Sequence, residues 1–231
     1  MSLQHIFEKL ALLGAEWVLW LLVVLSVLSI AVMLDRVLFF RRIRTNLAEL
    51  SRRLRDMLAR DDVDGAMSLL DGDSSVEAAV ARAGLVEAHR GPVVAEEAMA
   101  SARVQQKLRL ERWQSFLGTL GNNAPFIGLF GTVIGIIKAF HTLSISTNPE
   151  MKFIMADIGQ ALVATGVGLI VAIPAVVAHN VLQRKVRQVM GRTEAVGHVV
   201  MAYLRSEGGK GQKSSGGAVE SDDGSDSEAR S

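Results

Sequence analysis

The stretch WVLWLLVVLSVLSIAVML, from Trp17 to Leu34, contains no charged residue. At a rise of about 1.5 Å per residue, a helix of this length nearly crosses a hydrocarbon core of roughly 30 Å. Asp35 and Arg36 close the stretch, and it lacks the basic leader and small-residue cleavage site of a secretory signal peptide. The sequence therefore predicts a transmembrane helix over residues 17–40.

Two further uncharged stretches follow, WQSFLGTLGNNAPFIGLFGTVIGII from Trp113 to Ile137 and another from Ile158 to Leu182. Glycine costs a helix in water close to 1 kcal/mol relative to alanine, whereas membrane helices accept it because small residues let neighbouring helices approach. Pro174 predicts a kink in the third stretch. We therefore expect an all-α membrane protein with transmembrane helices over 17–40, 113–140 and 157–182 and with long cytoplasmic helical extensions.

The composition excludes several classes of function. Of the 231 residues, 49% are hydrophobic, and the mean hydropathy is +0.28. A net charge of +1 provides no basic field for nucleic acid. The chain has no cysteine and its five histidines are scattered, so neither a disulfide nor a metal site is expected. No catalytic motif is present, and we expect a protein that is not an enzyme and binds no cofactor.

Basic residues predict the orientation in the membrane. The N-terminal lead-in holds only Lys9, and the segment between the second and third stretches holds only Lys152, with Lys138 at its edge. Cytoplasmic flanks carry the excess of lysine and arginine. We therefore expect the N-terminus outside and the C-terminus inside. The basic residues behind this assignment are Arg41, Arg42, Arg44, Arg52, Arg53 and Arg55 after the first stretch, and Arg184, Lys185, Arg187 and Arg192 after the third.

The segments outside the membrane have distinct patterns. Residues 1–16 place their large apolar side chains on one face and predict an amphipathic lead-in on the outer surface. Segment 41–112 mixes both charges and predicts a cytoplasmic helical domain. Its clearest apolar stripe consists of Leu47, Leu50, Leu54 and Leu58.

Breaks and helix starts divide the rest of the chain. Residues 61–64 and 71–74 predict helix breaks or caps, and Pro92 begins a further helix. No breaker precedes the second transmembrane stretch, so a helix continuing through Ile137 would be about 67 Å long. The remaining segments are a short periplasmic loop over 141–156, a cytoplasmic helix over 183–205 and a disordered acidic tail over 206–231.

Small residues form a stripe along each of the last two transmembrane stretches. At alternating steps of four and three, the second stretch presents Gly121, Pro125, Gly128, Thr132, Gly135 and Ala139. The same steps along the third give Ala161, Thr165, Gly168, Ala172, Ala175 and His179. Such stripes pack helices closely, or they line a narrow polar path. We assign a packing role to Gly121, Pro125, Gly128, Gly135, Gly168 and Pro174.

Thr132 and Thr165 lie at matching depths on these stripes. Their distances from the outer ends of their stretches place the hydroxyls roughly 8 and 10 Å below the outer edge. Two hydroxyls in one layer can line a pore or bind water within it. The alternative is that each bonds the carbonyl four residues earlier in its own helix.

Polar residues also stand near the membrane boundaries. Asp157 and Gln160 are one helical turn apart near the outer surface, and an ionisable group at a membrane entrance is a candidate for a proton path. Asp157 is equally suited to cap the third helix. We interpret His179, near the inner boundary, as a satisfied polar residue rather than a proton relay.

Two motifs resemble one known family. The stretch LGNNAPFIGLFGTVIGIIKAF (Leu120–Phe140) resembles the pattern N-x-A-P-x-x-G-L-x-G-T-V-x-G of the TolQ/ExbB/MotA proton-channel family. The stretch IGQALVATGVGLIVAIPAVVAHN (Ile158–Asn180) is similar to that family's third-helix pattern, A-L-x-x-T-x-x-G-L-x-x-A-I-P-A. The Asp35-Arg36 step and the large cytoplasmic segment agree, so the resemblance covers about residues 17–205.

The resemblance implies an assembly and a set of roles. It implies a pentamer whose second and third helices surround the single transmembrane helices of an ExbD/TolR-like partner, each with an essential aspartate. Protons would pass along that aspartate and the pore-lining threonines, which match Thr132 and Thr165. Gln160 departs from the pattern, because TolQ and ExbB have a functional glutamate there. Either Asp157 or the partner's carboxylate then takes the proton role.

The expected function is an inner-membrane energy converter of a Gram-negative bacterium. It would couple the proton motive force to TonB-type uptake, Tol-type envelope maintenance or gliding motility. The alternative is a scaffold that anchors a related complex without conducting ions, which the neutral Gln160 favours. A solute transporter usually has more spans and internal repeats. Because three helices cannot enclose an aqueous path, any channel requires an oligomer.

Overall fold

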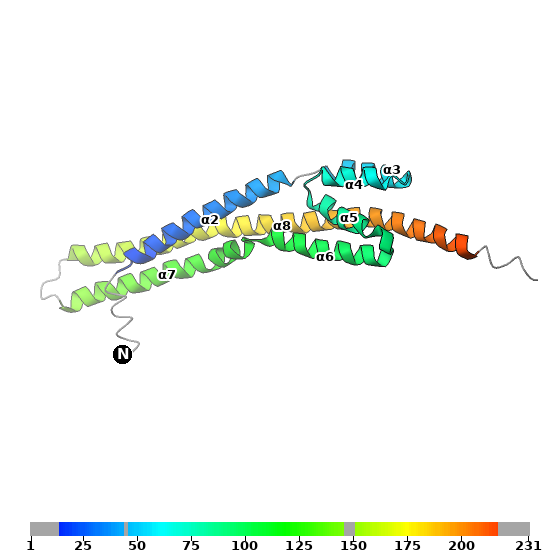
Figure 1. The fold of residues 1–231 in the computed structure, drawn as a ribbon. Helices are drawn as coiled ribbons and strands as arrows, with labels where there is room; N and C mark the ends of the chain where they lie inside the picture. The colour runs from blue at the N-terminus through cyan, green and yellow to red at the C-terminus, as the bar shows by residue number, and fades with distance from the viewer. Residues whose placement is uncertain (1–13, 44–45, 146–150, 217–231) are drawn as a thin grey trace, which may run out of the picture. The chain divides into compact units, whose positions relative to one another are not determined.

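A computed structural model describes residues 14–43, 46–145 and 151–216. In these ranges, the three helices that begin at Glu16, Gln114 and Met151 are long and apolar enough to cross a membrane, and no strand occurs. The predicted all-α membrane fold is therefore confirmed. Most of the lead-in expected over 1–16 lies outside the described residues. The elements in Figure 1 are α2 (Glu16–Arg42), α3 (Leu47–Ala59), α4 (Val63–Asp71), α5 (Val76–Val86), η1 (Ala88–Arg90), α6 (Pro92–Glu111), α7 (Gln114–Ile145) and α8 (Met151–Gly216).

The chain divides into two compact units. The first, which we call the membrane unit, consists of Met1–Arg41 and Glu111–Val186 and contains α2, α7 and the first part of α8. The second, which we call the polar unit, consists of Arg42–Leu110 and Arg187–Ser231 and contains α3 to α6 and the later part of α8.

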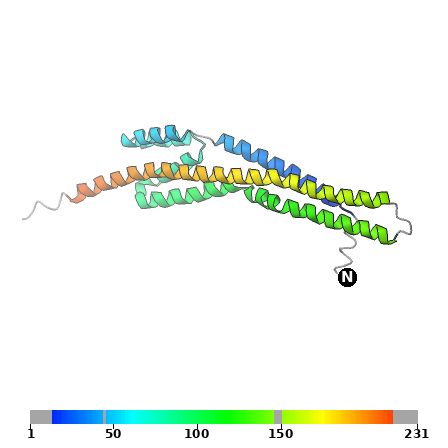
Figure 2. The ribbon, with the colours of Figure 1, turned by 180° about the vertical axis from the view of Figure 1, so that it is seen from behind.

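In the membrane unit, α2, α7 and the first part of α8 lie side by side (Figures 1 and 2). Their shared core consists of Val18, Leu22, Leu120, Ala124, Ile134, Val171, Ala172 and Ala175. Helix α2 buries only a narrow face and leaves large apolar side chains exposed, among them Trp20 at 71% and Val27 at 62%. An apolar helix exposed in this way is suited to lipid rather than water.

In the polar unit, the predicted leucine stripe of α3 faces the hydrophobic core. Leu50, Leu54 and Leu58 are buried, and Leu47 packs against the same core. The predicted break after α3 is capped by Asp62, whose carboxylate accepts a hydrogen bond from the Gly65 N–H at 2.8 Å. After the break that follows α4, Ser75 caps the start of α5, and its hydroxyl accepts a hydrogen bond from the Ala78 N–H at 3.1 Å.

The expected continuous helix from Pro92 to Ile137 is interrupted. Helix α6 ends at Glu111 and α7 begins at Gln114, and Trp113 between them has a positive φ of 66°. A bulky residue in this conformation costs about 1–2 kcal/mol. Local preference therefore does not favour the break, and neither glycine nor proline marks it in the sequence.

Helix α8 is longer than the third transmembrane stretch at both ends. It begins at Met151, inside the expected loop over 141–156, and reaches Gly216, inside the segment 206–231 that was expected to be disordered. Extending an existing helix adds one hydrogen bond for each residue fixed, which is easier than starting a new one. The rest of that tail, 217–231, lies outside the described residues.

Candidate functional site

The small-residue stripes of α7 and α8 face each other and form a seam. A Cβ atom placed on Gly128 would lie 2.7 Å from the carbonyl oxygen of Ala164, and one on Gly168 would lie 2.7 Å from that of Ala124. Because the obstructing atoms belong to the backbone, no side-chain adjustment would relieve these contacts. Near the other end of the seam, a Cβ atom on Gly135 would lie 2.5 Å from that of Ala161. Glycine thus allows the two helix backbones to touch.

Thr132 lies on the α7 side of this seam, one turn beyond Gly128. It is buried, and its hydroxyl donates a hydrogen bond to the Leu129 carbonyl at 2.6 Å. The alternative of a bond within its own helix therefore holds for Thr132, at a spacing of three residues rather than four. The oxygen keeps its capacity to accept a hydrogen bond.

Thr165 lies on the α8 side, and its surroundings differ. Its Cα is 3.0 Å from a Cβ atom placed on Gly128, so it stands at the closest part of the seam. Its hydroxyl oxygen is buried and has no hydrogen-bond partner among the described residues. Bonding within its own helix therefore does not occur here. Most buried polar atoms are bonded to protein or water, so an unpaired hydroxyl is a place where a further partner is expected.

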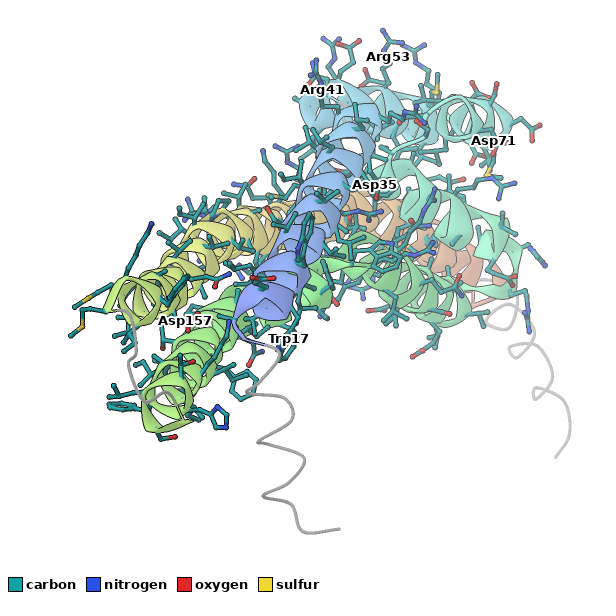
Figure 3. All side chains as sticks on the ribbon, turned by 90° about the vertical axis from the view of Figure 1, so that its left-hand side faces the viewer. Trp17, Asp35, Arg41, Arg53, Asp71 and Asp157 are labelled. Atoms are coloured by element: carbon teal, nitrogen blue, oxygen red, sulfur yellow. The ribbon has the colours of Figure 1, made fainter. Side chains whose placement is uncertain are left out.

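Asp157 pairs with a residue of the facing helix. Its carboxylate lies 3.2 Å from the Nζ atom of Lys138 on α7, and the two side chains are 17% and 31% exposed. Figure 3 shows Asp157 on α8, where that helix meets α7. Because α8 begins at Met151, Asp157 is not its N-cap, and that interpretation is wrong.

The other polar candidates lie elsewhere along the same helices. Gln160 is half-buried and lies one turn beyond Asp157. His179 lies near the far end of the membrane unit, where its Nδ1 is 3.0 Å from the Gln114 carbonyl oxygen. Its ring also fills the space beside Gly118. This contact agrees with the interpretation of His179 as a satisfied polar residue.

The two prolines sit inside their helices. Pro125 is half-buried within α7, and Pro174 is exposed within α8. Neither has an N–H, so the carbonyls of Gly121 and Ile170 lack their usual helical donors. In a membrane such carbonyls are additional acceptors for water or a partner group. Among the described residues, no cluster of histidine and carboxylate side chains could hold a metal ion.

Comparison with known proteins identifies the family. Residues 73–195, more than half of the chain, match the MotA/TolQ/ExbB proton channel family. The biopolymer transport protein ExbB of Neisseria meningitidis serogroup A is 31% identical over 221 residues, which are 90% of this chain and 99% of that protein. The chain belongs to the MotA/TolQ/ExbB family.

Other members of the MotA/TolQ/ExbB family match over shorter regions. The putative biopolymer transport protein ExbB-like 2 of Helicobacter pylori is 46% identical over 83 residues, 36% of this chain and 55% of that protein. The Tol-Pal system protein TolQ of Pseudomonas aeruginosa is 38% identical over 95 residues, 41% of each chain. This chain thus spans about half the length of these two relatives.

One feature of this family member was missed in the sequence. Lys138 served only as a marker of orientation, yet it forms the ion pair with Asp157. A signal was available, because Asp157 adjoins position 158, the next step along its stripe before Ala161. Lys138 stands beside Ala139, the last residue of the facing stripe. Charges that flank the ends of two facing stripes can lie near each other.

Proposed function

We propose that this chain is the proton-conducting subunit of an inner-membrane energy converter. The observation that carries the proposal is the buried, unpaired hydroxyl of Thr165, which lies beside Gly128 of α7. Gly128 is one turn from Thr132 on the same helix. The Thr165 hydroxyl needs a partner that the described residues do not supply. We propose that water or a carboxyl group of a partner helix is that partner, as proton transfer along a chain of hydrogen bonds requires.

The path is completed by neighbouring chains and a partner. Three transmembrane helices cannot enclose an aqueous path, so we propose a homo-oligomer, a pentamer by family resemblance. An ExbD/TolR-like single-span protein supplies a membrane aspartate. Thr132, Thr165 and Gln160 line the route, and Gln160 contributes hydrogen bonds without titrating. Each charge that crosses 100 mV releases about 2.3 kcal/mol, enough to bias a conformational cycle.

The same proposal includes the orientation of the chain in the membrane and the process that it powers. The N-terminus would be periplasmic and the C-terminus cytoplasmic, as the distribution of basic residues favours. The names of the relatives favour biopolymer transport or Tol-type envelope maintenance as the powered process. Gliding motility is a further process that such a converter could drive.

Replacing each threonine by valine tests the proposal, because valine keeps the shape and removes the hydroxyl. Proton flux is measured in vesicles that contain the chain and its single-span partner. We expect Thr165→Val to reduce partner-dependent flux by about 10²-fold or more, the scale at which a positioned proton-transfer group acts. Thr165→Ser restores the hydroxyl and should recover most of the flux.

Thr193→Val is the matched control. Thr193 is buried in the polar unit, with its hydroxyl bonded to the Val189 carbonyl at 2.8 Å. Its replacement removes a buried hydroxyl without touching the seam, and flux should stay at the wild-type level. Normal flux in both Thr132→Val and Thr165→Val, with normal assembly, would contradict the proposed role.

A second candidate function is a scaffold that anchors a related complex without conducting ions. The close backbone contact at Gly128 and Gly168 and the neutral Gln160 favour it. Flux in the same vesicles discriminates between the two functions. Flux that disappears when the partner's aspartate is neutralised rules the scaffold out, whereas absence of flux from the intact complex supports it.

A further inference from the structure

The ion pair between Lys138 and Asp157 joins α7 to α8 at one end of the membrane unit. A distance of 3.2 Å between Nζ and the carboxylate permits a direct charge-assisted hydrogen bond. Both side chains are largely buried in a single chain, at 31% and 17% exposure. Removing one partner of a pair shielded in this way is costly, because it leaves the other charge unpaired in a poorly solvated place.

The neighbours of this pair belong to the seam. A Cβ atom on Gly135 would lie 3.5 Å from the backbone oxygen of Asp157, directly beside its contact with Ala161. The ion pair therefore lies directly beside the close contact between Gly135 and Ala161. On the α7 side, the Lys138 chain runs past Gly14, where a Cβ atom would lie 3.1 Å from Nζ. Gly14 has a positive φ of 73° and comes just before α2. Segments of all three helical regions thus meet at Lys138.

We infer that Lys138 and Asp157 are a positioning pair that fixes α8 against α7 at the outer end of the seam. By fixing the register, the pair keeps Thr165 opposite Gly128. Asp157 then acts through the seam and does not itself carry protons. This inference rests on the proposed function for its effect on flux, but the pair itself can be tested without measuring flux.

The alternative role for Asp157 is that of a proton carrier. A carrier must release its proton to the next group along the path, and it needs a carboxyl group at position 157 whatever stands at position 138. A positioning pair needs only opposite charges at the two positions. Exchanging the two residues therefore separates the roles, because it removes the carboxyl group from α8 and keeps the attraction.

The first experiment measures partner-dependent proton flux in vesicles for Asp157→Asn, Lys138→Gln and the exchange variant Lys138→Asp/Asp157→Lys. We expect each single variant to lose between about 10-fold and 100-fold of the flux, the scale of a misplaced site. The exchange variant should recover at least half of the wild-type flux. Lys152→Gln removes an exposed lysine from the first turn of α8 and should leave flux unchanged. An assembled exchange variant as inactive as Asp157→Asn would overturn the inference.

A second experiment decides the matter if the exchange variant does not assemble or if the wild type shows no flux. The midpoint of thermal unfolding in detergent is measured for the wild type, Asp157→Asn, Lys138→Gln and the double variant. We expect the double variant to be destabilised by clearly less than the sum of the two single losses, because each single variant leaves an unpaired charge. Additive losses would overturn the positioning pair. If the losses are coupled but the wild type conducts no protons, the proposed function is rejected and the positioning pair is retained.

Discussion

Glu77 is a carboxylic acid buried at the first turn of α5 in the polar unit, with an exposure of 2%. Burial raises its pKa above the ordinary value of 4.5, and the nearby carboxylate of Asp73 acts in the same direction. Its backbone hydrogen bond and the charge of Arg192 on α8 oppose this effect without cancelling it. The fold therefore disfavours the ionised form of this side chain.

The raised pKa fixes the sign of a pH dependence. Below pH 4.5 the side chain is neutral in both folded and unfolded chains, and it contributes no penalty. As pH rises through the higher pKa of the folded state, ionisation is disfavoured there and stability is lost. We expect Glu77→Gln to raise the free energy of unfolding near neutral pH by about 1 kcal/mol, the usual scale of a single substitution.

The measurement is the difference in thermal midpoint between Glu77→Gln and the wild type, from pH 4 to pH 8. This difference should grow as pH rises. Glu97→Gln is the control, because Glu97 is exposed on α6 and its replacement should change the free energy of unfolding by less than about 0.5 kcal/mol. A difference for Glu77→Gln that stays constant across this range would contradict the interpretation.

At the residue scale, the sequence predicted where the two threonines lie better than it predicted which groups they bond. The stripe pattern placed Thr132 and Thr165 on the facing sides of α7 and α8, because a helical repeat depends only on spacing. It could not predict that Thr132 bonds the Leu129 carbonyl while Thr165 has no partner among the described residues. That difference depends on side-chain rotation at the seam, which residue spacing does not determine.

At the element scale, two glycines of α8 offer a matched pair. A Cβ atom on Gly168 would meet the Ala124 carbonyl oxygen at 2.7 Å, whereas one on Gly166 would meet nothing within 4 Å. We expect Gly168→Ala to destabilise the chain by about 1–3 kcal/mol, because the helices must separate. Gly166→Ala should be neutral or stabilising by up to about 1 kcal/mol, because alanine favours helix.

Thermal unfolding of both variants in detergent checks this prediction. Equal stability of the two variants would show that the seam does not hold α7 against α8. A loss for Gly166→Ala that occurs only in the assembled oligomer would instead assign that glycine to a contact between chains.

Element boundaries were predicted unevenly, for local reasons. Pro92 fixed the start of α6 because proline is favoured in the first turn of a helix. The break at Trp113 was missed because no residue near it favours a positive φ. The start of α8 at Met151 was also missed, because hydropathy marks the apolar part of a helix and not the turn before it. The sequence therefore predicted the helix boundaries that a residue such as proline determines locally, and it missed the others.

At the scale of the whole molecule, the orientation in the membrane remains a prediction from charge. The chain contains no cysteine, so a single introduced cysteine reports its own location. Ser144 is exposed near the end of α7, and Glu194 is exposed on α8 in the polar unit. The predicted orientation places position 144 on the periplasmic side and position 194 in the cytoplasm.

A membrane-impermeant maleimide separates the two sides. In cells with a permeabilised outer membrane and an intact inner membrane, we expect labelling of Ser144→Cys and none of Glu194→Cys. After the inner membrane is disrupted, both variants should react, and the cysteine-free wild type should not react in either condition. The opposite labelling pattern would reverse the orientation. Lys138 and Asp157 would then lie at the cytoplasmic end of the seam, and protons from the periplasm would reach Thr165 before passing the pair.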